Sequence, residues 1–174
     1  MLIKNGLVFT DSCLFEKKDI LISKDKISRL EEPRSFHSSL SSDSYDASDC
    51  YIIPGLTDIH FHGCMGYDFC DGTDEALEAI TTYELSQGIT TICPATMTLP
   101  EESLLKICQH AANYAPKTLG ATICGINLEG PFLSYAKKGA QNPSYLRCPD
   151  QAMLSRLLEV SNHLIKLVAI APEE

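Results

Sequence analysis

The sequence predicts a mixed α/β fold in which a small β unit precedes βα units built around a parallel sheet. Two observations predict this class. The first fifty residues contain short segments rich in Ile, Leu, Val and Phe, which is typical of strands. From residue 51 onward, apolar strand-like segments alternate with amphipathic helix-like segments, the pattern of parallel α/β folds.

In the first part of the chain, the apolar segments predict three strands, at residues 1–10, 19–23 and 26–30. The sequence SKDK at 23–26 suits a hairpin turn between the last two. Residues 37–49 are rich in Ser and Asp and have little to bury, so a mobile linker is expected there. These features predict that residues 1–50 form a small β unit and that residues 51–174 form the βα units.

The second part of the chain is expected to contain four strands, at residues 51–62, 89–97, 121–132 and 165–173. The first helix is expected within 71–88, with an apolar stripe of Ala76, Leu77, Ile80 and Tyr83 and a stop at Gly88. The second is expected to begin with a capping box, TLPE at 98–101, and to bury Leu104, Leu105, Cys108, Ala111 and Ala112. The third is expected after its cap, Asp150, and to bury Met153, Leu154, Leu157 and Leu158.

The segment TDIHFHG at 57–63 places two histidines two residues apart. In an extended strand, alternate side chains share a face, so Asp58, His60 and His62 are expected on one side of the sheet. Glu129 follows another predicted strand, where alternation sets Asn127 and Glu129 opposite Ile126 and Leu128.

Imidazole and carboxylate ligands suit zinc, iron or manganese better than calcium or magnesium. Because the carboxyl ends of parallel strands meet at one edge, His60, His62 and Glu129 are expected to hold a divalent metal. Asp58 can either orient an imidazole or satisfy nearby backbone groups. Cys64 and Cys70 flank the histidines, but small buried thiols are the simpler interpretation.

The long connection at 130–149 follows Glu129, and long loops in compact domains are often functional. Lys137, Lys138, Gly139, Gln141, Asn142 and Arg147 make it a candidate binding loop for an anionic or polyhydroxylated ligand. Against this, a Lys-Lys pair is often simply solvated.

Composition narrows the function classes. A formal charge of −9, from 14 basic and 23 acidic residues, argues against nucleic acid as a partner. No stretch approaches the roughly 20 apolar residues that cross a bilayer, and the first residues do not form a signal peptide. The eight cysteines include no Cys-x-x-Cys pair. A cytoplasmic protein without membrane association is therefore expected.

Four motifs together resemble one enzyme family. They are PGLTDIHFHGCMGYDFCDGT (54–73), PATMT (94–98), LEGPFLSYAKKGAQNP (128–143) and IAPE (170–173). The chain resembles the amino-terminal half of N-acetylglucosamine-6-phosphate deacetylases, in the amidohydrolase superfamily. The resemblance implies a TIM-type (β/α)₈ barrel with a small β-sandwich, of which this chain would contain the first four βα units and part of the sandwich.

The resemblance also implies an activity: metal-dependent hydrolysis of the N-acetyl group of N-acetylglucosamine 6-phosphate, an amino-sugar phosphate, to acetate and glucosamine 6-phosphate. Glu129 would bind the main metal, zinc or iron first and manganese as an alternative, and His60 and His62 a second metal. Residues Gly139, Ala140, Gln141 and Asn142 would contact substrate, with Gln141 standing where relatives often have histidine. A homodimer is expected for the full-length protein.

Four βα units are at most half a barrel, and the family's general base and two further histidine ligands lie on later strands. This chain alone is therefore expected to be an incomplete, inactive deacetylase. Two alternatives remain open at this point. One is a cyclic-amide hydrolase of the same superfamily, similar to dihydroorotases and hydantoinases, and the other is a non-catalytic fragment that binds metal or sugar phosphate.

Overall fold

The computed structural model describes residues 1–35 and 43–174, which form two compact units, Met1–Pro54 and Gly55–Glu174. Of the stretch predicted to be a mobile linker, residues 37–42 lie outside the described residues. Residues 44–46 of that stretch form a short strand. We call the two units unit 1 and unit 2 and describe each by itself.

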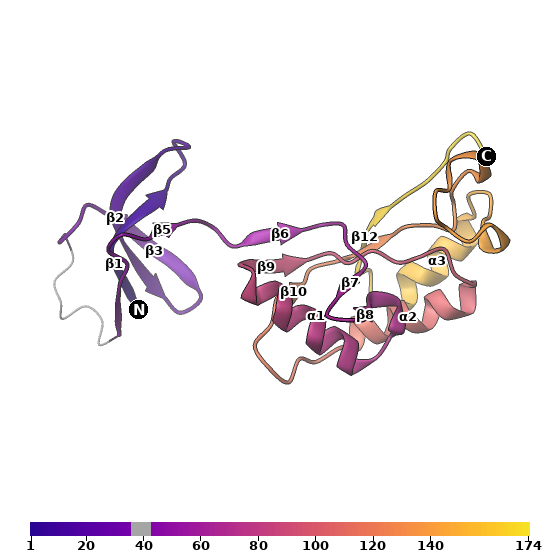
Figure 1. The fold of residues 1–174 in the computed structure, drawn as a ribbon, viewed down its shortest axis with the longest axis horizontal. Coiled ribbons are helices and arrows are strands. Elements are labelled where there is room, and N and C mark those ends of the chain that lie inside the picture. Colours follow the sequence, from indigo (N-terminus) through magenta and orange to yellow (C-terminus); the bar gives the residue numbers. More distant parts are fainter. Residues whose placement is uncertain (36–42) are drawn as a thin grey trace. The chain divides into compact units, whose positions relative to one another are not determined.

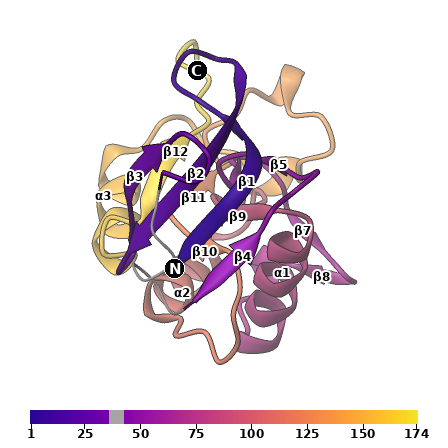
Figure 2. The ribbon, with the colours of Figure 1, turned by 90° about the vertical axis from the view of Figure 1, so that its left-hand side faces the viewer.

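Unit 1 is a single β-sheet with the strand order β3-β2-β1-β4, and β5 also pairs with β1. Figure 2 faces this sheet. The hairpin predicted at SKDK is confirmed, because Ser23 pairs with Lys26 across an antiparallel β2–β3 ladder. The strands are β1 (Leu2–Phe9), β2 (Phe15–Ser23), β3 (Lys26–Glu31), β4 (Ser44–Asp46) and β5 (Tyr51–Ile52).

Unit 2 contains parallel strands with three helices on one side of them (Figure 1). One sheet has the order β10-β9-β6 and a second consists of β11 and β12, while β7 and β8 form a hairpin. The strands are β6 (Leu56–Asp58), β7 (Gly63–Cys64), β8 (Tyr67–Asp68), β9 (Ile89–Ile92), β10 (Thr122–Ile123), β11 (Ile126–Leu128) and β12 (Ile165–Val168). The helices are α1 (Asp74–Ser86), α2 (Glu101–Asn113) and α3 (Gln151–Val160).

The two sheets of unit 2 meet at one point, an isolated parallel bridge between Ala95 and Asn127. All pairings within both sheets are parallel, as the alternation of strands and helices predicts. Among the described strands there is no closed barrel. The structure therefore shows a mixed α/β unit.

The apolar core of unit 2 lies between the helices and the β11–β12 sheet. Leu104 and Cys108 of α2 and Met153 and Leu157 of α3 are fully buried there, as predicted. Asp150 caps α3, because its side chain accepts a hydrogen bond from the Met153 N–H. The predicted third helix is thus confirmed together with its cap.

Several local predictions are wrong. The strand expected over 121–132 is two strands, β10 and β11, which belong to different sheets. The strand expected over 51–62 is broken at Pro54-Gly55 into β5 and β6, and β6 ends at Asp58. Tyr83 is 38% exposed, because Glu84, eight residues after Ala76, takes the inward position on α1. The capping box of α2 does not form, since its N-cap is Pro100 and no side chain caps that end.

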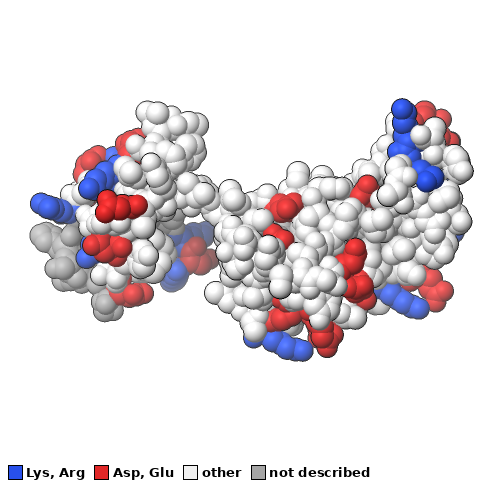
Figure 3. Space-filling model, viewed as in Figure 1, with Lys and Arg blue, Asp and Glu red and all other residues white. Residues whose placement is uncertain are grey.

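The charged side chains form no broad basic surface on the face in Figure 3, where acidic and basic groups are interspersed among the described residues. None of the described helices combines the length and the apolar run that crossing a bilayer would need.

Glu78 ties α1 to the segment that follows α2. Its carboxylate accepts hydrogen bonds from the Tyr114 hydroxyl at 2.5 Å, the Lys117 N–H at 3.2 Å and the Thr118 hydroxyl. These donors stabilise the charged form and lower the pKa of Glu78 to about 2, the Thr118 bond contributing most.

Glu78→Gln is expected to destabilise unit 2 at pH 7 because the amide is a weaker acceptor than the carboxylate. A pKa that folding lowers adds stability that is complete above the ordinary value of 4.5 and is lost as pH falls toward about 2. Urea unfolding monitored by circular dichroism should therefore show that the free energy of unfolding falls less between pH 5 and pH 2 in Glu78→Gln than in wild type. Glu75→Gln, an exposed change on the same helix, serves as the control. Equal pH slopes for wild type and Glu78→Gln would contradict this role.

Candidate metal centre

The two histidines lie in the loop that follows β6. Asp58, the last residue of β6, accepts a hydrogen bond from the His60 N–H at 2.9 Å, which turns the chain at the strand end. The Phe69 N–H donates to the His62 carbonyl at 2.6 Å. The ring centroids of His60 and His62 are 5.5 Å apart at an interplanar angle of 80°. The rings thus converge from a loop and not, as predicted, from a continuous strand.

Glu129 directly follows β11, and its direction comes from the alternation predicted for that strand. Ile126 and Leu128 are fully buried in the core, so Asn127 and Glu129 project from the opposite side. The Glu129 N–H donates to the Thr96 hydroxyl at 3.1 Å. Gly130 has a φ of 81°, and a Cβ there would meet the Thr98 hydroxyl at 2.0 Å, so only glycine permits this turn without displacement.

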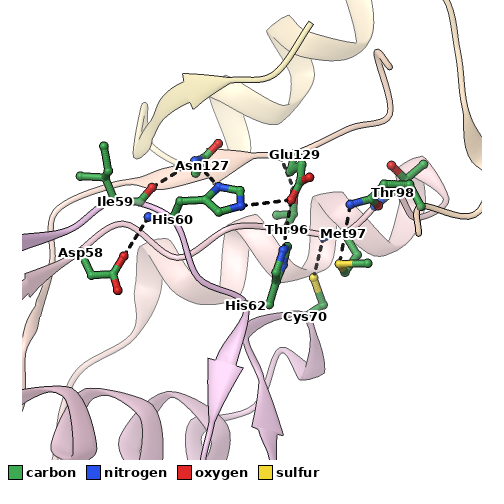
Figure 4. Close-up of polar contacts among 11 residues, drawn as sticks. Asp58, Ile59, His60, His62, Cys70, Thr96, Met97, Thr98, Asn127 and Glu129 are labelled. Atoms are coloured by element: carbon green, nitrogen blue, oxygen red, sulfur yellow. Dashed lines mark hydrogen bonds and ion pairs between the residues drawn. The ribbon is translucent and has the colours of Figure 1, made fainter. Parts of the chain in front are cut away.

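The three predicted ligands meet at one carboxylate oxygen (Figure 4). Glu129 Oε2 lies 3.1 Å from His62 Nε2 and 3.6 Å from His60 Nε2. One ligand atom from each of the three residues falls within 4.8 Å of the others. The structure thus brings together the three residues that the sequence selected.

The donor set fits a divalent metal. Among the described residues, Glu129 Oε2 and His62 Nδ1 are buried and have no hydrogen-bond partner. Two imidazoles and a carboxylate match the ligand preferences of zinc, iron and manganese. An oxygen faced by two ring nitrogens without a proper hydrogen bond is an arrangement that a shared cation would satisfy.

Asn127 reaches the same site from β11. Its Nδ2 lies 3.0 Å from the Ile59 carbonyl oxygen and 3.1 Å from His60 Nδ1. Asp58 does not orient an imidazole, because the contact made by its carboxylate is with the His60 backbone. The second of the two roles considered for Asp58 is therefore the one observed.

Neither nearby cysteine joins the cluster. Burial is the main cause that raises the pKa of the Cys70 thiol, to about 12, and Cys70 Sγ accepts a hydrogen bond from the Met97 N–H. Burial, followed by the nearby Glu84 carboxylate, raises the pKa of Cys64. The metal-binding form of cysteine is the thiolate, so both thiols are poor ligands at neutral pH.

The predicted substrate loop contains both buried and exposed residues. Gln141 is 5% exposed, and its Oε1 accepts a hydrogen bond from the Thr98 N–H at 2.7 Å. Asn142 Oδ1 accepts from the Ser144 N–H at 3.0 Å, while Gly139 and Ala140 are exposed. The Gln141 side chain thus anchors the loop to residues 94–98.

Sequence reasoning missed the part played by residues 94–98. Thr96 is fully buried and holds the Glu129 backbone, and Thr98 holds Gln141. The sequence predicted residues 94–97 as the end of a strand and Thr98 as part of a capping box, and it did not predict their contacts with Glu129 and Gln141. A buried threonine directly before a helix gives no sign in the sequence of the strand-end backbone that it contacts.

The known proteins that match this chain in sequence and in structure are sugar-phosphate deacetylases. No protein-family model matches the chain. The N-acetylglucosamine-6-phosphate deacetylase of Lysinibacillus sphaericus is 29% identical over 175 residues, which cover 100% of this chain and 44% of the relative. The N-acetylgalactosamine-6-phosphate deacetylase of Escherichia coli O157:H7 is 32% identical over 127 residues, 71% of this chain and 33% of the relative.

A similar solved structure is a variant N-acetyl-D-glucosamine-6-phosphate deacetylase from Mycobacterium smegmatis in complex with N-acetyl-D-glucosamine-6-phosphate. It matches with a TM-score of 0.85 and 28% identity over 100% of this chain and 44% of that one. The chain spans less than half the length of these relatives.

Gln141→Ala is expected to destabilise unit 2 by about 1–3 kcal/mol, because it leaves the buried Thr98 N–H without an acceptor. Hydrogen exchange at the Thr98 amide should become faster in the variant. Gln109→Ala, the same change at an exposed position on α2, is the control and should leave that exchange rate unchanged. Slow exchange at Thr98 in Gln141→Ala would contradict the anchoring role.

Proposed function

We infer that this chain, a homologue of N-acetylglucosamine-6-phosphate deacetylases that spans about 45% of their length, forms part of a metal-dependent deacetylase. The proposed reaction is hydrolysis of the N-acetyl group of N-acetylglucosamine 6-phosphate, which gives acetate and glucosamine 6-phosphate. One observation supports it above the others: His60, His62 and Glu129 converge at strand ends in a chain that matches such enzymes along its whole length. A complete protein would close the strands of unit 2 into a (β/α)₈ barrel.

In this proposal Glu129, His60 and His62 hold the metal, zinc or iron first and manganese as an alternative. A bound metal of this kind polarises an amide carbonyl and lowers the pKa of water. The chain's own residues orient the ligands: Thr96 holds the Glu129 backbone, and Asp58 holds that of His60.

The general base is proposed to lie outside this chain. Among the described residues, no carboxylate other than Glu129 joins the cluster. Asp58 is near in sequence, but its Oδ1 is engaged by the His60 N–H. A water nucleophile at this site therefore requires a base from elsewhere, as the resemblance implies.

Substrate is proposed to contact the loop after Glu129. The exposed backbone of Gly139 and Ala140 and the side chain of Asn142 are available to a sugar, whereas the Gln141 side chain acts by anchoring the loop. The Mycobacterium smegmatis relative is in complex with N-acetyl-D-glucosamine-6-phosphate, which supports the glucosamine compound as the substrate in preference to its galactosamine epimer. The Escherichia coli relative gives one specific reason to assay the galactosamine epimer as well.

Glu129→Gln is expected to lower zinc affinity of the 174-residue chain at least about tenfold, because an amide replaces the one anionic ligand. Metal content after dialysis against zinc, measured by mass spectrometry, tests this. Glu159→Gln, the same change at an exposed site on α3, is the matched control. Full metal occupancy in Glu129→Gln would contradict the ligand assignment.

The zinc-loaded 174-residue chain is expected to release no acetate from N-acetylglucosamine 6-phosphate, since its cluster has no base. The protein translated from the complete reading frame is expected to release acetate and to discriminate against a cyclic amide such as dihydroorotate. An enzyme-coupled acetate assay measures both. Activity of the chain alone would refute the proposed external base, and failure of the complete protein on both amino-sugar epimers would refute the deacetylase proposal.

A further inference from the structure

Asn127 makes two contacts through one nitrogen atom. Its Nδ2 faces the Ile59 carbonyl oxygen at 3.0 Å and His60 Nδ1 at 3.1 Å (Figure 4). A carbonyl oxygen only accepts hydrogen bonds, so Ile59 requires the NH₂ side of the amide to face it. The opposite orientation would bring two oxygens together. The backbone of Ile59 therefore fixes which end of the Asn127 amide meets the His60 ring.

The orientation of Asn127 has a consequence for the imidazole. An NH₂ group donates, so His60 Nδ1 must accept and carries no proton. The ring proton of neutral His60 then lies on Nε2, the atom that faces Glu129 Oε2 at 3.6 Å. We propose that Asn127 is a positioning residue that holds metal-free His60 as the Nε2–H tautomer.

Asn127 itself is held firmly. Its N–H donates to the Pro94 carbonyl, and its carbonyl accepts from the Thr96 N–H, both at 2.9 Å. It also pairs with Ala95 as a parallel bridge, and Ala95 donates to the Phe61 carbonyl. Residue 95 thus lies between β11 and the histidine segment, joined to both through its backbone.

The effect of this tautomer on metal binding rests on the proposed function. A metal binds the lone pair of an imidazole nitrogen, so a metal at His60 Nε2 requires the proton to leave that atom and another to bind Nδ1. The ring stays neutral overall. The Asn127 amide must then turn to present its oxygen to Nδ1–H, and the Ile59 carbonyl loses its donor. His62 carries no such constraint, because its Nδ1 has no partner among the described residues.

The tautomer can be read directly in the 174-residue chain, freed of metal with a chelator and labelled with ¹⁵N-histidine. Long-range ¹H–¹⁵N spectra near pH 8 assign the proton to one ring nitrogen, and His60→Gln identifies the His60 signals. Wild type is expected to show Nε2–H. Asn127→Asp replaces the donor by an acceptor and should convert His60 to Nδ1–H.

Asn113→Asp is the matched control, with the same chemical and charge change at the end of α2, where the Asn113 side chain donates to the Gln109 carbonyl. It should leave the His60 pattern of wild type. Metal-free wild type with Nδ1–H at His60, or Asn127→Asp that retains Nε2–H, would overturn the inference. If Asn127→Asp does not fold, Asn127→Ala replaces it, and removal of the donor should raise the Nδ1–H population measurably; an unchanged population would also overturn the inference.

Zinc titration adds a second readout. Asn127→Asp should bind zinc about tenfold more tightly than wild type, because a carboxylate that accepts from Nδ1–H leaves Nε2 free for the metal. If Asn127→Asp converts the His60 tautomer but binds zinc no more tightly than wild type, the inferred effect of the tautomer on metal binding is overturned. If wild type shows Nε2–H but no variant binds zinc, the proposed function fails and the tautomer assignment stands.

Discussion

Burial of Ile126 and Leu128 against the helices determines where Glu129 points. Both side chains are fully buried, and each is worth about 1.5–3 kcal/mol on transfer from water. A shift of β11 by one residue would lose this gain and would drive Asn127 and Glu129 into the apolar core. The packing of α2 and α3 on β11 therefore keeps the carboxylate at the site. The candidate metal centre depends in this way on residues outside the His60, His62 and Glu129 cluster.

Residues 94–98 connect the parts of the site that are far apart in the sequence. Ala95 hydrogen-bonds to Phe61 in the histidine segment, and Thr96 hydrogen-bonds to both Asn127 and Glu129. Thr98 continues to Gln141 in the following loop. Because these contacts are mostly made by the backbone, they fix positions without using the side chains that carry charge. A change in this segment is expected to move the ligands relative to one another.

The sequence predicted the site better than the local structure around it. Alternation in β11 placed Glu129 correctly because its neighbours Ile126 and Leu128 are unambiguously apolar. The strand assigned to His60 and His62 was wrong, although the two rings do converge. Two histidines spaced two residues apart can bring their rings together from a strand or from a turn. The sequence cannot show that Asp58 bends the chain by accepting a hydrogen bond from the His60 N–H. Likewise, nothing in the sequence shows that Gln141 bonds to a backbone 43 residues away.

The two histidines differ in how the protein constrains them, although the His-x-His pattern treats them as equals. Asp58 fixes the His60 backbone and Asn127 its ring, whereas the His62 ring is oriented by its contact with Glu129 and has an unpartnered Nδ1 among the described residues. A cation at Glu129 Oε2 would bind His62 without breaking a hydrogen bond. It would bind His60 only with loss of the hydrogen bond from Asn127 to the Ile59 carbonyl. Any ion bound to all three would join the β6 loop to the end of β11, two segments that Asn127, Glu129 and residues 94–98 already bring into contact. Metal binding would therefore stabilise unit 2 as well as equip it for chemistry.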